Sequence, residues 1–213
     1  MNSWIAERTG TRFIWLLCAL LALLLLAPVF ESGGYDKGLL VVLLTLVLLA
    51  AINAARGRRG QLITAICLGL PWLVLHWIPF TSELFWLRIV EEMSLLALLY
   101  FTVGVVLSSV VSAEKVDKDI LCGGLAIYLL LGVTWAVSYD LMEFLVPGSF
   151  TNVDPEIAWT RLVYFSFTTL TTLGYGDISP TTPFAQTWSV LEAGTGVLYV
   201  AVLVARLASL YQR

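Results

Sequence analysis

Charged side chains are scarce in this sequence. Only 13% of the 213 residues are Asp, Glu, Lys or Arg, whereas soluble globular proteins carry about 25%. The net charge is -3, and no long basic tract is present. This composition is not that of a soluble domain, and the lack of basic tracts argues against a nucleic-acid partner.

Histidine and cysteine are also rare. The chain has one histidine, His76, and three cysteines without paired spacing, Cys18, Cys67 and Cys122. Neither a disulfide framework nor a Cys/His metal site follows from them, and no nucleophile elbow or phosphate-binding loop is present. We therefore expect no enzyme, no catalytic residue and no cofactor. We interpret His76 as a packing residue, with a role in pH sensing as the alternative.

Long apolar runs fill most of the chain. Hydrophobic residues make up 59% of it, and the mean hydropathy is +0.89. A helix needs about 20 apolar residues to cross a bilayer. Six spans can be drawn, with Pro71 inside the third: Phe13–Phe30, Gly38–Ala54, Leu62–Ile78, Phe85–Val111, Ile120–Leu145 and Pro183–Leu210. The sequence predicts an all-α membrane protein with six transmembrane helices.

Basic residues are distributed unequally between the loops. With six spans, nine of the twelve lie on one side: Arg8, Arg12, Arg56, Arg58, Arg59, Lys115, Lys118, Arg206 and Arg213. Cytoplasmic loops are enriched in Lys and Arg. We therefore expect a multi-pass protein of the cell membrane, with both termini in the cytoplasm and the connection between the fifth and sixth spans outside.

The segment Ser112–Asp119, SAEKVDKD, separates the first four spans from the last two. It is polar, and we expect a cytoplasmic linker that is either an interfacial helix or a solvated connector. Tyr139 lies toward the end of the fifth span, where aromatic residues often form an interfacial belt.

The connection between the fifth and sixth spans contains an unusual stretch, TTLTTLGYGD at residues 168–177. The preceding segment, Trp159–Thr171, has the pattern of a short helix. About a dozen residues reach roughly 18 Å, which is too short for a bilayer core of about 30 Å. This helix must therefore re-enter from the outer side. Because non-helical backbone at membrane depth must be buried in protein or line a water-filled cavity, residues 172–177 are predicted to line a path.

The residue types in this stretch suit a cation that leaves water. Rings of backbone carbonyl groups, with a Thr hydroxyl, can replace its hydration oxygens. Gly174 and Gly176 allow the dihedral angles that point successive carbonyls one way, and Thr172 adds a hydroxyl oxygen. We expect Leu173 and Tyr175 to point away from the path and pack behind it. The C-terminal end of the short helix, with its negative dipole, favours a cation in the cavity below.

The run TTLGYGD resembles the potassium-channel signature Thr-x-Gly-Tyr-Gly-Asp, with Leu173 at the variable position. The resemblance covers the pore unit, about Ile120–Leu210. It implies selectivity for K⁺ over Na⁺, with the filter made by Thr172, Leu173, Gly174, Tyr175, Gly176 and Asp177 and with K⁺ held at the first four. It also implies a fourfold homotetramer, so that each chain has three identical partners. Independently, one loop per chain requires several copies to surround an ion.

The region before the filter departs from this family. Many members carry a Trp pair early in the pore helix, one of which donates a hydrogen bond to the Asp after the filter. Tyr164 and Phe165 occupy the matching positions here, and Phe165 cannot donate. We expect Asp177 to bond to Tyr164, another hydroxyl or water, and we include Thr168 and Thr171 among the bracing residues.

The sixth span contains EAGTGVLYVAVLVARL. The family's inner helix often has a glycine hinge here, for which Gly196 is the first candidate and Gly194 the second, and close helix packing is the alternative. Glu192 lies one turn before Gly196, and an ionisable residue inside a span is a functional candidate. One interpretation is a gating or ion-attracting carboxylate near the filter. The other is a buried acid, charged or protonated, that bonds to hydroxyls of the short helix such as those of Thr168 or Thr171.

The fourth span carries one basic residue, Arg88, and we expect Glu91 and Glu92 to pair with it. Voltage-sensing spans carry Arg or Lys at every third position. The predicted domains are therefore residues 1–111, which resemble a voltage-sensor domain without its charges; a linker at 112–119; and a pore domain at 120–213 with outer helix, pore helix, filter and inner helix. No steep voltage sensing is expected.

The preferred interpretation is a passive K⁺-selective channel surrounded by membrane lipids. The alternatives are a weakly selective cation channel, the membrane subunit of a K⁺ uptake transporter, and a non-conducting sensory or scaffold protein. The complete Gly-Tyr-Gly with Thr172 argues against the first alternative, and the single pore loop argues against the second. A scaffold would leave the threonines and glycines unexplained.

Overall fold

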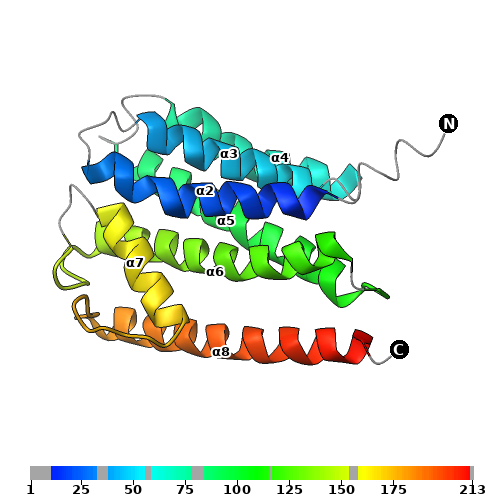
Figure 1. The fold of residues 1–213 in the computed structure, drawn as a ribbon. Helices are drawn as coiled ribbons and strands as arrows, with labels where there is room; N and C mark the ends of the chain where they lie inside the picture. The colour runs from blue at the N-terminus through cyan, green and yellow to red at the C-terminus, as the bar shows by residue number, and fades with distance from the viewer. Residues whose placement is uncertain are drawn as a thin grey trace. The chain divides into compact units, whose positions relative to one another are not determined.

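The helices of the protein follow its apolar runs. The computed structural model describes residues 11–32, 38–55, 59–77, 84–115, 117–153 and 158–211. Figure 1 shows the helices, which are α2 (Arg12–Ser32), α3 (Gly38–Ala54), α4 (Arg59–His76), α5 (Phe85–Val111), α6 (Lys118–Leu145), α7 (Ala158–Leu170) and α8 (Pro183–Tyr211). Within these ranges the only β pairing is an isolated bridge between Phe150 and Pro180. The predicted all-α class is confirmed for the described residues.

The predicted helix bounds agree closely with the observed ones. α3 and α5 have the predicted ends, α7 is shifted by one residue, and α4 continues through Pro71. By length and composition α5, α6 and Pro183–Ser209 of α8 can cross a membrane, while Arg12–Ala27 and Val42–Ala54 are shorter apolar helices. The protein is thus a helical membrane protein with three membrane-capable helices in the described ranges. The arrangement with six spans stays a prediction.

The polar linker is not helical where the structure describes it. Residues 112–115 and Asp117 lie outside any helix, and α6 begins at Lys118. Of the two expected forms, the helix is therefore not observed in these residues, and a non-helical connector is. Four of the nine basic residues used to predict the orientation lie outside the described residues: Arg8, Arg56, Arg58 and Arg213. The orientation stays a prediction.

The chain forms two compact units, Met1–Leu130 and Leu131–Arg213. Their boundary falls inside α6 and not at the linker, so the compact units differ from the predicted membrane domains, which stay a prediction. In the first unit α2 packs against α3, and α4 packs against α5. Asp119 accepts hydrogen bonds from the backbone nitrogens of Phe13 (3.0 Å) and Ile14 (3.3 Å). Because the first N–H groups of a helix lack helical partners, Asp119 caps α2 from a distant part of the sequence.

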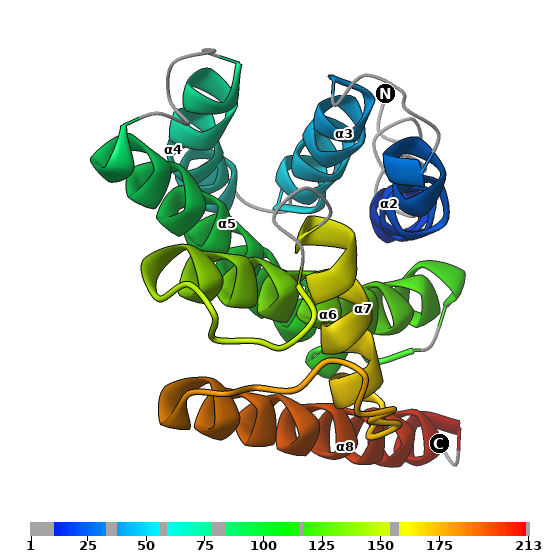
Figure 2. The ribbon, with the colours of Figure 1, turned by 90° about the vertical axis from the view of Figure 1, so that its left-hand side faces the viewer.

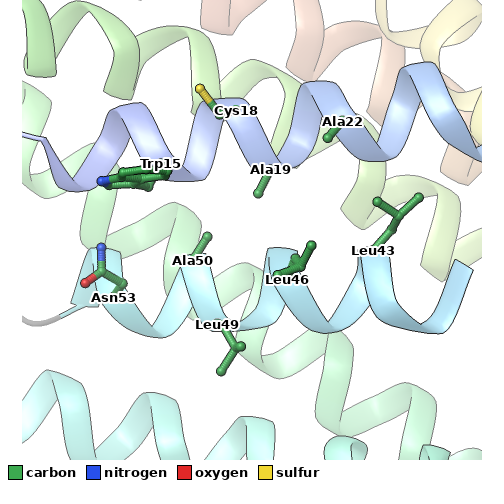
Figure 3. Close-up of a pocket in the computed structure, with 9 residues that line it drawn as sticks. All are labelled: Trp15, Cys18, Ala19, Ala22, Leu43, Leu46, Leu49, Ala50 and Asn53. Atoms are coloured by element: carbon green, nitrogen blue, oxygen red, sulfur yellow. The ribbon is translucent and has the colours of Figure 1, made fainter. Parts of the chain in front are cut away.

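A groove of about 430 Å³ lies between α2 and α3. Figure 3 shows Trp15 and Asn53 at one end of it, and Ala22 and Leu43 at the other. None of its nine lining residues is charged. Apart from Asn53, Trp15 and Cys18, the groove is lined by Ala and Leu.

Glu91 of α5 has a partner that the sequence did not predict. It contacts Nδ1 of His76 on α4, and the His76 ring stacks on Trp72 with 4.6 Å between ring centroids. The expected partner of Glu91 was Arg88, one turn earlier on the same helix. The observed contact instead joins two neighbouring helices of the first unit and places His76 in their packing.

In the second unit α7 is inclined to α8, and its C-terminal end lies against that helix (Figures 1 and 2). The rings of Tyr139, Phe150 and Phe165 pack together with centroids 5.1–5.2 Å apart. A Cβ added at Gly132 of α6 would lie 2.5 Å from the ring of Phe167, so α6 and α7 approach closely there. Tyr139 is fully buried, as expected of an aromatic residue that packs inside the protein and not of one in an interfacial belt.

Candidate functional site

Residues 172–177 leave the end of α7 with an unusual backbone. The angle φ is positive at every second residue: 58° at Thr172, 51° at Gly174 and 81° at Gly176. L-residues with a Cβ seldom adopt such angles, whereas glycine adopts them readily. A Cβ added at Gly174 or Gly176 would meet no atom within 4 Å. Backbone conformation, and not crowding within the chain, therefore explains these two glycines.

The amide groups at the start of this segment point back to α7. The nitrogens of Leu173 and Gly174 donate to the carbonyl oxygen of Thr168, at 2.8 and 3.0 Å. The N–H and C=O of a trans peptide unit point in opposite directions, and the chain has no cis peptide bond among its described residues. The carbonyl groups of Thr172 and Leu173, which belong to these two peptide units, are therefore both directed away from Thr168. Two successive carbonyls thus face a common side, unlike those of a regular strand.

The segment is exposed to solvent in the single chain. Residues 171–177 are all exposed, with 55% of Leu173 and 68% of Tyr175 accessible. The Tyr175 ring stacks on Tyr164, with the centroids 6.4 Å apart and the planes 4° from parallel. The side chain of Tyr175, which was expected to pack behind the path, therefore stacks on Tyr164 and stays largely exposed in the single chain.

Asp177 is held from two directions. The hydroxyl of Tyr164 donates to its Oδ1 at 3.1 Å, so the first of the three expected partners is the observed one. A tyrosine hydroxyl is protonated at neutral pH and can therefore donate this hydrogen bond. Asn152, which the sequence did not single out, donates from Nδ2 to the carbonyl oxygen of Asp177 at 2.7 Å. Its φ of 55° fits the tolerance of asparagine for left-handed turns.

The chain after the segment is joined to the turn after α6. Phe150 and Pro180 form the isolated bridge, the Thr151 nitrogen donates to the Ser179 carbonyl at 2.9 Å, and the Ser179 nitrogen donates to Thr151 Oγ1 at 2.9 Å. This clip, which comprises residues 150–151 and 179–180, closes a loop that contains α7 and residues 172–177. Both ends of the exposed segment are therefore anchored within one chain.

The other predicted bracing residues act differently from expectation. The hydroxyls of Thr168 and Thr171 donate within α7, to the carbonyl oxygens of Phe165 (2.9 Å) and Phe167 (2.7 Å). Thr168 therefore holds the segment through its backbone oxygen and not through its side chain. Phe165 packs against Tyr139 in the aromatic cluster described above.

Glu192 is fully buried on α8 and bonds to a hydroxyl of α7, as one of the two interpretations expected, but the hydroxyl is that of Ser166 and not of Thr168 or Thr171. Its Oε2 lies 2.5 Å from the Tyr139 hydroxyl, and its Oε1 lies 2.5 Å from Oγ of Ser166. The predicted partners, Thr168 and Thr171, instead use their hydroxyls within α7. The carboxyl group therefore joins α8 to both α6 and α7.

Neither partner of Glu192 was identified from the sequence. The position of Ser166 on a buried helix face, however, could have been predicted. Ser166 lies four residues after Leu162 and one after Phe165, and all three are buried. Positions i, i+3 and i+4 share one helix face, so periodicity places Ser166 on the buried stripe of α7. Tyr139 lies in a long apolar run, in which no periodic pattern distinguishes a buried face.

The two glycines of α8 have different surroundings. A Cβ added at Gly196 would lie 2.0 Å from the carbonyl oxygen of Leu170 at the end of α7, whereas one at Gly194 would meet nothing within 4 Å. α8 is a continuous helix through both positions. Close packing, the alternative considered for Gly196, is therefore observed, and a hinge at either glycine stays a prediction.

Residues 121–213, which include α7, the exposed segment and α8, match a family model described as "Ion channel". The chain is 35% identical over 83 residues to "Two pore potassium channel c" of Oryza sativa subsp. japonica, a match that covers 38% of this chain and 17% of that protein. It is 36% identical over 80 residues to "Inward rectifier potassium channel Kirbac3.1" of Paramagnetospirillum magnetotacticum, covering 36% and 24%. It is 32% identical over 85 residues to "Two-pore potassium channel 4" of Arabidopsis thaliana, covering 40% and 27%.

These matches span about a quarter or less of each relative's length. The similarity to ion channels lies in the C-terminal part of this chain, from residue 121 onward.

Proposed function

We propose that this chain is one subunit of a potassium-selective channel that conducts K⁺ passively across the cell membrane. The observation that carries the proposal is the common direction of the Thr172 and Leu173 carbonyls, away from α7 and toward the open side of the segment. Carbonyl oxygens arranged in rings can take the place of the hydration shell of K⁺. Residues 172–177 are then the selectivity filter, α7 the pore helix and α8 the inner helix.

Four copies complete the filter. One segment presents one row of oxygens, which cannot surround an ion, whereas cyclic symmetry repeats the row around an axis. Apolar side chains that one chain leaves exposed on α8, such as Val190 (72%) and Leu198 (66%), offer surface to neighbouring copies and to lipid. The names of the matched relatives support K⁺ as the ion.

The first prediction tests conduction and selectivity. Purified protein in liposomes is expected to carry K⁺ much faster than Na⁺. Gly174→Asp and Tyr175→Ala are expected to remove the K⁺ flux, because the first forces a side chain onto a positive φ and the second removes the ring that stacks on Tyr164. Radioactive or fluorescent flux assays measure both ions.

The outcomes separate the candidate functions. Equal K⁺ and Na⁺ flux would support the weakly selective channel in place of the proposed one. No flux from the wild type would overturn the channel proposal and favour a scaffold or a transporter subunit that needs other chains. Flux that survives both substitutions would show that residues 172–177 are not the filter.

The second prediction concerns voltage. α5 carries a single basic residue, Arg88, and each charge that crosses the membrane field contributes only about 2.3 kcal/mol per 100 mV. We propose that the channel does not sense voltage steeply. Recordings in planar bilayers are expected to show an open probability that changes little with voltage. A gating charge comparable to that of voltage-gated channels would contradict this.

A further inference from the structure

Three side chains and one carbonyl group meet where α6, α7 and α8 converge. Glu192 lies 2.5 Å from Tyr139 and 2.5 Å from Ser166, and Ser166 Oγ also lies 2.7 Å from the carbonyl oxygen of Gly132. All three side chains have 0% of their surface exposed. We call Glu192, Tyr139, Ser166 and the Gly132 carbonyl the Glu192 junction.

The number of hydrogens in the Glu192 junction depends on the charge of Glu192. A serine hydroxyl has one hydrogen and a backbone carbonyl has none, so the contact between Ser166 and Gly132 uses the hydrogen of Ser166. The contact between Tyr139 and Glu192 uses the hydrogen of Tyr139. The remaining contact, between Ser166 and Glu192, then needs a third hydrogen, which only a protonated Glu192 can supply. A carboxylate would leave two oxygens facing each other without a hydrogen between them.

Burial leads to the same conclusion by a different route. An ionised carboxylate is expensive to bury unless a positive charge or several hydrogen bonds compensate for it. Among the residues that the structure describes, no Lys, Arg or His forms an ion pair with Glu192. A neutral acid avoids this cost, and it also matches the donors and acceptors that surround it.

We infer that Glu192 is a neutral carboxylic acid that donates a hydrogen bond to Ser166, accepts one from Tyr139 and thereby positions α7 between α6 and α8. Its role is positioning and not attraction of the ion. The role in conduction rests on the proposed function, because α7 carries the proposed filter. The protonation state and the joining of the helices do not depend on that function.

The first test is rescue by an isostere. Glu192→Gln keeps the shape of the neutral acid, since its amide oxygen can accept from Tyr139 and its NH₂ group can donate to Ser166. We expect the Tm in detergent to stay within about 2 °C of the wild type and the K⁺ flux to stay within about twofold. Glu192→Leu, which keeps the size but no polar atom, is expected to lower the Tm by at least about 4 °C and to reduce the flux.

The second test is spectroscopic and needs no conduction. The infrared difference between wild type and Glu192→Gln at neutral pH is expected to show the loss of a C=O band of a protonated carboxylic acid, shifted in D₂O. Loss of carboxylate bands instead would overturn the inference. Glu192→Gln that fails to fold, or folds and loses K⁺ flux, would also overturn it. Absence of flux in the wild type, with the acid band present, would overturn only the proposed channel function.

Discussion

Replacing Gly176 with Ala is expected to lower K⁺ flux about five- to thirtyfold, whereas the same change at Gly148 leaves flux intact. The two glycines have nearly equal φ angles, 81° and 84°, and a Cβ added at either would meet no atom within 4 Å. A residue with a Cβ costs about 1–2 kcal/mol in this conformation. The strain that an added Cβ causes is therefore similar at the two positions. The positions differ in which part of the backbone must move to relieve that strain.

At Gly176, strain can be relieved by rotating the preceding peptide unit, which turns the Tyr175 carbonyl away from its place in the proposed filter. About 1.4 kcal/mol corresponds to a factor of ten in an equilibrium constant, so a cost of about 1–2 kcal/mol would reduce the population of the strained filter about five- to thirtyfold. At Gly148 the same rotation moves the turn after α6 and breaks the hydrogen bond from the Gly148 nitrogen to Oε1 of Glu143 (2.7 Å), which can lower the Tm but leaves the proposed filter in place. Liposome flux and Tm, measured for both variants, check this. Equal loss at both positions would indicate a general folding defect, and no loss at Gly176 would contradict the proposed filter geometry.

Gly196→Ala is expected to be the most destabilising single-methyl change in the second unit. The added Cβ would lie 2.0 Å from the Leu170 carbonyl oxygen and 2.9 Å from its carbonyl carbon. Both atoms belong to the backbone at the end of α7, so no side-chain rotation can relieve the overlap. Overpacking typically costs about 1–3 kcal/mol, and we expect at least the upper end of this range. A Tm measurement in detergent is the direct check.

Gly194→Ala is the matched control, two residues earlier on the same helix. It meets no atom within 4 Å, and Ala is favoured over Gly inside a helix by about 1 kcal/mol. We expect an unchanged or higher Tm for this variant. Equal Tm values for the two variants would mean that α7 does not approach α8 at Gly196 as described. A change in channel opening in Gly194→Ala, with the Tm unchanged, would support a hinge there.

The helices were predictable because their signal is local. Long apolar runs interrupted by polar segments placed α3 and α5 at their observed ends, and length alone made α7 too short to cross a membrane. The positive φ at Gly174 and Gly176 was predictable for the same reason, since glycine is the residue type that tolerates it. The non-helical linker was undecided in the sequence, because both expected forms are polar.

The partners of buried polar groups were not predictable in this way. Hydroxyl residues occur at positions 166, 168, 169 and 171 of the chain, and together they cover most faces of a helix. Which one meets Glu192 depends on how α7 is rotated about its axis, since residues 166 and 168 lie about 200° apart around it. Likewise Glu91 could be assigned to Arg88 by spacing, but its contact with His76 depends on how α4 packs against α5.

The clip of residues 150–151 and 179–180 has a consequence for assembly. It closes the loop around α7 and residues 172–177 inside a single chain, so most of the ordering of that loop is complete before any other copy arrives. The conformational entropy lost on closing this loop is then lost when the chain folds, and not when the copies associate. The filter segment of the proposed channel is therefore preorganised in each chain. Association of four copies then requires little further ordering of this segment.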